Sequence, residues 1–487
     1  MDRPNILWLM TDEQRKDSLG LYGSPWAQTP NLDRLAAGGA VCENALTGSP
    51  VCIPARTSML TGRYPHSTGV WHNVKEKHDY RPLTDLLHEA GYQSASFGKQ
   101  HHALADRCFG HIEGFGVRHQ ATHFFHYFDP YDGADYDMVQ FPGVFPWVLA
   151  GRYPEGEETK AEYQVVDRAV EWLDERDASR PFLLRCSFPG PHTPVTPPVP
   201  YDTAIDSSDI AFPPEIETRQ RDLPRWLDRE WALTNSADLL THEQVSLMRQ
   251  HYYGFVSFLD AQFGRLLHAL GERGLLENTV IGFVADHGTL LGDYGFVQKG
   301  TFYEEDAGVP MFFAGPGVKP GTRITTPVSS VSFLSTLIEL AGITVPAYKG
   351  PVSDAPLNAD PGSGSARIEA PSLAAAITSG EEPEAHPILS EITLWDAGER
   401  AGKEFGPYRG YRHSLPRAMV RDGDLKYACA LTPEPVEPLL TDLEADPLEV
   451  KNYADDPAYA ERAAELRSMI GELVGGRLPQ TYTQEAR

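Results

Sequence analysis

The stretch ILWLMTDE, residues 6–13, decides the fold class of this chain of 487 residues. Its first five residues form a short, continuous apolar run, which is typical of a β-strand buried on both faces of a sheet. The run ends in Asp12 and Glu13, and two adjacent carboxylates at the end of a buried strand are costly without a positive partner. A hard divalent cation is the natural partner. A solvated loop carrying two acids is the alternative.

Three other predicted strands, at residues 91–97, 182–188 and 280–285, lead into polar side chains in the same way. These side chains are Lys99 with His101, His192, and Asp286 with His287. Prolines on both sides of His192 restrict the backbone there, so this imidazole is held in place. Taken alone, the cluster of Lys99 and His101 is more often plain surface charge, and a histidine in a turn such as His192 often has a purely structural role. Their shared position directly after a strand favours a common site.

Helical patterns separate these strands, at residues 83–90, 159–176, 242–271 and 331–341. Strands that alternate with helices predict an α/β fold, a largely parallel sheet with helices on both faces. Ligands of such folds bind outside the carboxyl ends of the strands. We therefore expect residues 1–385 to form a catalytic domain. Residues 386–487, with three short predicted strands and a last helix, are expected to form a smaller α+β subdomain with an antiparallel sheet. The Ala-, Pro- and Ser-rich segment 350–384 is expected to be a surface linker.

The segment SPVCIPARTSMLTGR, residues 49–63, places a cysteine at the start of a predicted helix. Pro54 suits a first helical turn because its missing N–H costs nothing there. Cys52 would face free amides and the positive end of the helix dipole, and Arg56 adds a fixed charge one turn later. This pattern favours a nucleophile beside an anion site. The alternative is a buried structural cysteine, which is the commoner role of the residue.

The formal net charge is −26, with 42 Lys and Arg against 68 Asp and Glu. Its long-range field opposes nucleic acid and anionic membranes as partners and favours a small substrate. The five cysteines show no spacing typical of disulfides or zinc sites. The N-terminal apolar run is too short for a signal peptide, and no run of about 18 apolar residues follows. A cytoplasmic location is therefore expected.

Taken together, these residues resemble the type I sulfatase family of the alkaline phosphatase superfamily, close to bacterial sulfatases and phosphonate monoester hydrolases. The resemblance rests on five stretches: CIPAR (52–56) with TGR (61–63), GYQSASFGKQH (91–101), DHG (286–288), Lys299, and LLTDLEADP (439–447). It implies an alkaline-phosphatase-like fold, with a large, mixed, mostly parallel central sheet flanked by helices. Two irregular segments, 103–158 and 197–240, are poorly covered by it and are expected to select the organic part of the substrate.

The resemblance also implies a chemistry. A formylglycine-generating enzyme would oxidise Cys52 to formylglycine, whose hydrated aldehyde is the nucleophile of the family. One divalent metal ion would be held by a set of five residues, with calcium expected and manganese or magnesium as alternatives. The implied ligands are Asp12, Glu13, modified Cys52, Asp286 and His287.

The remaining implied roles concern the transferred group. Lys99 and Lys299 would grip its nonbridging oxygens. Arg56 would orient the nucleophile, and His101 and His192 would assist the nucleophile and protonate the leaving oxygen. Asn73 would line the substrate pocket, where Lys99, His192 and Lys299 also contact the substrate.

Three residues depart from the family pattern. Ala55 replaces a frequent serine, Glu13 stands where many members have Asp, and His287 stands where many sulfatases have Asn. Because imidazole suits a transition metal better than calcium, His287 also fits phosphonate monoester and phosphodiester hydrolases, which favour manganese. Three hypotheses follow: a hydrolase of a small aryl, choline-like or sugar sulfate, a phosphonate monoester or phosphodiester hydrolase, and a non-catalytic metal-containing binding protein with unmodified Cys52. A homo-oligomer is compatible with each.

Overall fold

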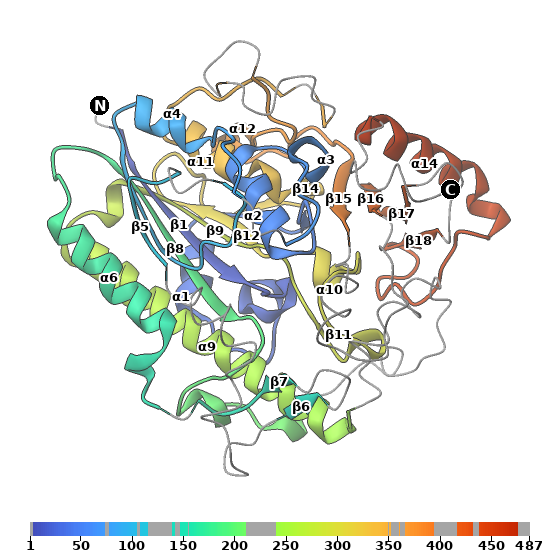
Figure 1. Ribbon diagram of the computed structural model, residues 1–487, viewed down its shortest axis with the longest axis horizontal. Helices are drawn as coiled ribbons and strands as arrows, with labels where there is room; N and C mark the ends of the chain where they lie inside the picture. The colour runs from blue at the N-terminus through green and yellow to red at the C-terminus, as the bar shows by residue number, and fades with distance from the viewer. Residues whose placement is uncertain are drawn as a thin grey trace.

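A computed structural model describes most of the chain (Figure 1). The described residues are 3–73, 77–104, 108–114, 139–141, 147–153, 155–210, 240–348, 350–351, 360, 366–393, 416–431 and 438–475. Most of the segments 103–158 and 197–240, which we expect to select the substrate, lies outside these residues. Among the helices that these ranges contain, none combines the length and the apolar character needed to cross a membrane.

The molecule is built around an eight-stranded mixed sheet with the order β13-β2-β12-β9-β1-β8-β4-β5. Its central strand is β1, and β1 pairs in parallel with β8 on one side and β9 on the other. The strands are β1 (Asn5–Asp12), β2 (Ala40–Cys42), β4 (Gln93–Gly98), β5 (His111–Glu113), β8 (Phe182–Pro191), β9 (Thr279–Ala285), β12 (Met311–Ala314) and β13 (Thr322–Ile324). The antiparallel strand β12 makes the sheet mixed. The predicted α/β class with a mostly parallel central sheet is confirmed.

The continuous apolar run at the N-terminus is explained by two separate cores, one on each face of the sheet. Leu7 and Leu9 of β1 point into the core under α1, α6 and α9, whereas Ile6, Trp8 and Met10 point into the other core, under α2, α4, α11 and α12. The helices of the first face are α1 (Pro30–Ala37), α6 (Ala161–Glu175) and α9 (His242–Glu272). Those of the second are α2 (Cys52–Thr61), α4 (Thr84–Glu89), α11 (Phe333–Leu340) and α12 (Ala374–Ser379).

A separate antiparallel sheet of four strands follows in the C-terminal part of the chain. Its strands are β15 (Ile388–Ile392), β16 (Arg417–Asp422), β17 (Leu425–Ala430) and β18 (Leu439–Asp442), and α14 (Ala460–Val474) packs on it. Three of these strands were expected from the sequence, and β18 is an additional one. The other face of the sheet packs against residues of the main part of the chain, including Leu46 and Leu290. The red and orange elements at one side of Figure 1 are this sheet and α14.

Short elements complete the described structure. The helices are α3 (Pro65–Thr68) and α10 (Glu304–Ala307), and the strands are β3 (Ala45–Leu46), β6 (Val139–Phe141), β7 (Trp147–Ala150), β10 (Leu290–Leu291), β11 (Val297–Gln298) and β14 (Val328–Ser329).

The prediction of a surface linker at 350–384 is wrong for its described second half. Ile368, Leu373 and Ile377 are at most 2% exposed, and they pack in the same core as α11. The composition of this segment is typical of a linker, but its few Ile and Leu residues, in α12 and just before it, are buried in this core. Residues 352–359 and 361–365 lie outside the described part of the chain.

Candidate active site

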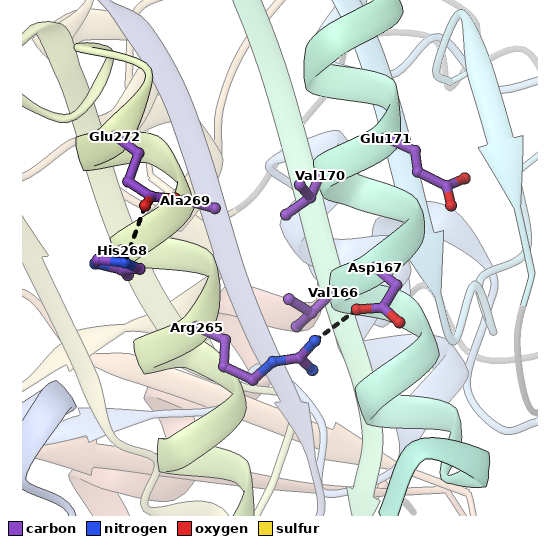
Figure 2. A pocket seen from close by; sticks show the side chains of 8 residues that line it. All are labelled: Val166, Asp167, Val170, Glu171, Arg265, His268, Ala269 and Glu272. Carbon is purple, nitrogen blue, oxygen red and sulfur yellow. Dashed lines mark hydrogen bonds and ion pairs between the residues drawn. The ribbon is translucent and has the colours of Figure 1, made fainter.

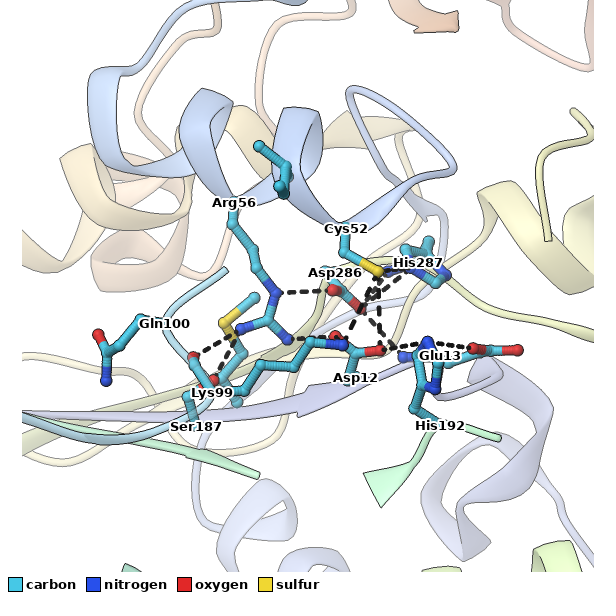
Figure 3. Close-up of polar contacts among 12 residues, drawn as sticks. Asp12, Glu13, Cys52, Arg56, Lys99, Gln100, Ser187, His192, Asp286 and His287 are labelled. Atoms are coloured by element: carbon cyan, nitrogen blue, oxygen red, sulfur yellow. Dashed lines mark hydrogen bonds and ion pairs between the residues drawn. The ribbon is translucent and has the colours of Figure 1, made fainter. Parts of the chain in front are cut away.

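The predicted strand ends meet at one edge of the central sheet (Figure 3). Asp12 is the last residue of β1, and Lys99, His192 and Asp286 each come directly after a strand. In Figure 3 these side chains converge below the start of α2, which carries Cys52. The parallel neighbours β4, β8, β1 and β9 bring them together because their carboxyl ends lie side by side. The same location was expected from the sequence.

Cys52 is the first residue of α2 and is 1% exposed. Its Sγ lies 3.2 Å from Nε2 of His287 and 3.3 Å from Nζ of Lys299. It also lies 3.9 Å from Nζ of Lys99 and 3.8 Å from Oδ1 of Asp12. Burial and the Asp12 carboxylate oppose ionisation, but the two lysines and His287 hold the pKa of the thiol well below its usual value. The side chain at position 52 is therefore surrounded by groups that stabilise negative charge.

Asn73 contacts the backbone at the start of α2. Its Oδ1 accepts a hydrogen bond from the backbone N–H of Ile53, at 2.9 Å. The first amides of a helix have no intrahelical acceptor, so Asn73 acts as a cap supplied from outside α2. The structure thus gives the Asn73 carbonyl a partner in the backbone next to Cys52.

Two buried carboxylates lie below the thiol, and Arg56 bridges them. Its Nη2 lies 2.7 Å from Oδ2 of Asp12 and its Nε 2.8 Å from Oδ2 of Asp286. Lys99 adds a second cation, 2.7 Å from Oδ2 of Asp12. Against the effect of burial, Lys99 and Arg56 lower the pKa of Asp12, whereas burial and the Asp12 charge raise the pKa of Asp286. Arg56 and Lys99 thus hold two carboxylates close together in a buried site, and carboxylate oxygens are the ligands that a hard divalent cation prefers.

One group of side chains has the composition and spacing of a metal site. Ligand atoms of Asp12, Cys52, Asp286 and His287 all lie within 4.8 Å of one another, and all four residues are buried. The Nδ1 of His287 lies 2.8 Å from the carbonyl oxygen of Gly288, so Nδ1–H donates there and Nε2 faces the group. Burial lowers the pKa of His287, but Asp286 and its neighbours raise it to about 10 overall. Neighbouring carboxylates favour positive charge on this imidazole, and a divalent metal can replace the proton on its Nε2. These residues therefore fit a metal.

Glu13 stands beside this group rather than within it. Its backbone has a positive φ of 63°, and its Oε2 lies 2.8 Å from Nζ of Lys299 and 3.4 Å from Nε2 of His192. Its Oε1 accepts a hydrogen bond from the hydroxyl of Thr289, at 2.8 Å. Glu13, Asp12 and His192 form a second group whose ligand atoms lie within 4.8 Å. The longer Glu side chain is here paired with Lys299.

The two histidines approach the site from different sides. His101 forms a hydrogen bond with Cys52, and burial is the main reason that its pKa is lowered, so it is neutral at pH 7. Its φ of 29° and a Nδ1 without a partner among the described residues mark it as conformationally unusual. The Nδ1 of His192 lies 2.5 Å from the carbonyl oxygen of Thr193, and its Nε2 faces the Asp12 and Glu13 carboxylates.

Three further residues support these groups and were not predicted from the sequence. Arg185 and Ser187 of β8 lie beneath Lys99, and Thr289 holds Glu13. A charged residue inside the otherwise apolar run FLLRCSF was a usable signal for Arg185. Thr289 directly follows the Asp286-His287-Gly288 segment, but nothing in the sequence marks its partner.

A shallow surface depression lies elsewhere, between α6 and α9 (Figure 2). An ion pair between Arg265 and Asp167, 2.6 Å apart, spans it, and His268 pairs with Glu272 on its rim. None of the residues that the sequence predicts for the site lies there.

Comparison with known proteins identifies the family of this chain. The sequence profile of the sulfatase family matches residues 4–343. An arylsulfatase of Clostridium perfringens is 30% identical over 376 residues, which cover 71% of this chain and 76% of the relative. A choline-sulfatase of Rhizobium meliloti is 29% identical over 469 residues, which cover 93% and 83%.

A solved structure with the same fold is the phosphonate monoester hydrolase of Agrobacterium radiobacter. The TM-score is 0.76 at 23% identity, and the match covers 98% of this chain and 96% of that one. The profile match and the sequence relatives assign the chemistry at the level of the family: the chain is an ester-bond hydrolase and belongs to the sulfatase family.

Proposed function

We propose that the chain is a metal-dependent sulfuric ester hydrolase that cleaves a small organic sulfate, using formylglycine made from Cys52 as its nucleophile. One observation carries this proposal: Sγ of Cys52 lies within 4 Å of two lysines, a histidine and a carboxylate. A nucleophilic atom at this place has cations on two sides for the oxygens of a transferred anionic group. The names of the sequence relatives, arylsulfatase and choline-sulfatase, support sulfate as that group.

Lys99 and Lys299 come from different loops, and their Nζ atoms approach position 52 at 3.9 Å and 3.3 Å. Their carboxylate partners, Asp12 and Glu13, fix both ammonium groups before a substrate arrives. Positive charge that is held in place stabilises the developing charge of a transition state without reorganisation. We assign to the two lysines the binding of the nonbridging oxygens.

His192 is the candidate acid for the leaving oxygen. Its side chain is 11% exposed, in contrast to the fully buried His287, so it lies nearer than His287 to the solvent side from which the organic group must enter. Its Nε2 lies 3.8 Å from Oδ1 of Asp12 and 3.4 Å from Oε2 of Glu13, so the ring is directed into the site. His101, neutral and hydrogen-bonded to Cys52, is placed to accept a proton from the nucleophile.

Asp12, Asp286 and His287, with Glu13 and the modified residue 52, would hold one divalent metal. Such an ion, when bound, lowers the pKa of a hydroxyl next to it and neutralises charge on the transferred group. Calcium remains the ion expected for a sulfatase, with manganese or magnesium as alternatives. Arg56 would keep the two aspartates apart from each other and oriented toward the ion.

Two measurements test the proposal. Protein produced together with a formylglycine-generating enzyme is analysed by mass spectrometry of the peptide that contains residue 52, and kcat/KM is measured on an aryl sulfate. We expect conversion of Cys52 to the aldehyde and turnover that depends on that conversion. A thiol that persists in protein made this way would instead favour the third hypothesis, a non-catalytic metal-containing binding protein.

A second candidate, a phosphonate monoester or phosphodiester hydrolase, is favoured by the position of His287. Its Nε2 faces the ligand group directly, and imidazole is a better ligand for manganese than for calcium. Parallel measurement of kcat/KM on an aryl sulfate and a phenyl phosphonate monoester separates the two candidates. A preference for the phosphonate of roughly a thousandfold, about 4 kcal/mol in transition-state stabilisation, would reject the sulfatase proposal.

A further inference from the structure

Arg185 is a buried cation that the proposed function does not use. It lies on β8, is 0% exposed, and its guanidinium carbon lies 5.1 Å from the ring centre of Trp8 and 5.7 Å from that of Phe109. No carboxylate of the described residues lies within ion-pair distance of it, and its Nε has no hydrogen-bond partner there. Burial, followed by repulsion from Arg56, lowers its pKa to about 9, so it keeps its charge at pH 7.

The contacts of Arg185 lead to one point in the active site. Its Nη2 donates to the backbone carbonyl oxygen of Lys99, at 3.2 Å, and Nη1 of Arg56 donates to the same oxygen, at 3.1 Å. Both arginines also reach the hydroxyl of Ser187, at 3.4 Å and 2.8 Å. Two guanidinium groups thus converge on the main chain of Lys99, whose Nζ approaches Cys52.

This arrangement is not needed for the fold. The two acceptors that Arg185 shares with Arg56 are bonded by Arg56 at the shorter distance. A third acceptor, Oε1 of Gln100, lies 3.4 Å from Nη1 of Arg185 and also accepts from the hydroxyl of Ser96, at 2.9 Å. An unpaired buried cation is destabilising compared with an apolar side chain of similar volume. Trp8, Phe109 and Met10 around it are apolar and would pack equally well against a methionine. Stability alone therefore does not account for an arginine at this position.

We propose that Arg185 is a positioning residue for Lys99, fixing the main chain of that lysine and adding permanent positive charge beneath the site of the transferred anion. The inference rests on the proposed function, in which Lys99 binds the nonbridging oxygens. This role explains why a charge lies in an apolar core. The Arg185 guanidinium lowers the stability of the folded protein, and it stabilises the transition state when an anionic group is transferred.

The test compares Arg185→Met and Arg185→Lys with the parent enzyme in its matured, metal-loaded form. Arg185→Met is expected to melt at the same or a higher temperature and to lose roughly 10- to 100-fold in kcat/KM, mainly in kcat, as for one lost preorganised electrostatic contact. Arg185→Lys keeps the charge and is expected to fall between the two in activity. If Arg185 had only a structural role, its replacement would lower the melting temperature and the activity together. A variant that is at least as stable as the parent and less active excludes that role.

Cys186→Val is the matched control, since Cys186 is the next residue of the same strand, equally buried, but faces the core on the opposite side of the sheet. We expect its kcat/KM to stay within about twofold of the parent. A lower melting temperature or failure of Arg185→Met to fold overturns the proposal, as does an activity loss no larger than that of Cys186→Val.

The result for Arg185 can be distinguished from a failure of the proposed function. If the parent enzyme turns over the phosphonate instead of the sulfate, the comparison is made on the phosphonate. If the parent turns over neither, the proposed function fails, and the melting temperatures still report whether Arg185 costs stability.

Discussion

The Nε2 atom of His287 lies 3.2 Å from the Sγ atom of Cys52, in a buried group that also contains the carboxylates of Asp12 and Asp286. The other ring nitrogen is fixed on the carbonyl oxygen of Gly288, so the side that faces the group is determined. A nitrogen ligand among oxygens changes which ions a site prefers, because imidazole is a better ligand for a transition metal such as manganese than for calcium. We therefore propose that His287 decides the metal preference of the site.

The variant His287→Asn is expected to shift this preference toward calcium. Asn offers a carbonyl oxygen in place of the imidazole nitrogen, and oxygen ligands suit calcium. The measurement is kcat/KM after removal of metal and reconstitution with either ion, together with metal content by elemental analysis. We expect the ratio of manganese to calcium activity to fall roughly tenfold or more, about 1.4 kcal/mol. An unchanged ratio would show that His287 does not bind the ion.

The variant Cys52→Ala is expected to lose turnover and to keep its fold. It deletes the nucleophile, so kcat should fall by about 10⁴-fold or more. The thiol makes contacts with charged groups rather than with a hydrophobic core, so its removal leaves no large apolar cavity. Melting curves and circular dichroism check the fold, and turnover of an aryl sulfate checks activity. Retained activity at a comparable melting temperature would refute the nucleophile assignment.

Much of this site could be predicted because parallel strands leave a simple pattern in the sequence. A strand buried on both faces is apolar throughout, so Asp12, Lys99, His192 and Asp286 stand out where their strands end. The shared carboxyl edge then follows from the fold class. Helix boundaries such as those of α9 were predicted within a residue or two for the same reason, a long and strongly periodic apolar stripe.

The remainder depends on contacts between distant segments, which no local pattern encodes. Asn73 reaches the backbone of Ile53 and Thr289 reaches Glu13, and both partners are set by the packed fold. The segment around α12 looked like a linker because small residues are common both in linkers and in tightly packed helices. Short strands such as β18 and β2 carry too few residues to show a period.

The variant His192→Ala is expected to affect poor leaving groups more than good ones. If His192 protonates the leaving oxygen, phenyl sulfate should lose roughly 10²- to 10⁴-fold in kcat/KM, and 4-nitrophenyl sulfate, whose leaving group needs little protonation, far less. Steady-state kinetics on the two esters give the ratio. His101→Ala is the matched comparison, since a residue that assists the nucleophile should affect both esters alike. Equal losses for His192→Ala would move the acid role to another group.

The last prediction concerns the contact between α10 and the C-terminal sheet, where Glu304 is the central charge. Its carboxylate lies 3.1 Å from Nζ of Lys426 on β17 and 3.3 Å from Nη1 of Arg421 on β16. Burial alone would raise the pKa of Glu304, but Lys426 and Arg421 outweigh it and lower the pKa to about 2, from its usual 4.5. A carboxyl whose pKa is lower in the folded state binds fewer protons there, so it stabilises the fold above about pH 4.5, and this contribution is lost as the pH falls toward 2.

The variant Glu304→Gln should therefore have a lower melting temperature than the parent at pH 7. The expected loss in the free energy of unfolding is on the order of 2 kcal/mol. The difference in stability should shrink as the pH is lowered from about 4.5 toward 2. Protonation of Glu304 then removes from the parent the ion pairs that the variant lacks at every pH. Melting temperatures measured across this range test the prediction, with Glu277→Gln, the same substitution at an exposed position, as the control. Parallel curves for the parent and Glu304→Gln at all pH values would mean that the ion pairs of Glu304 contribute no pH-dependent stability.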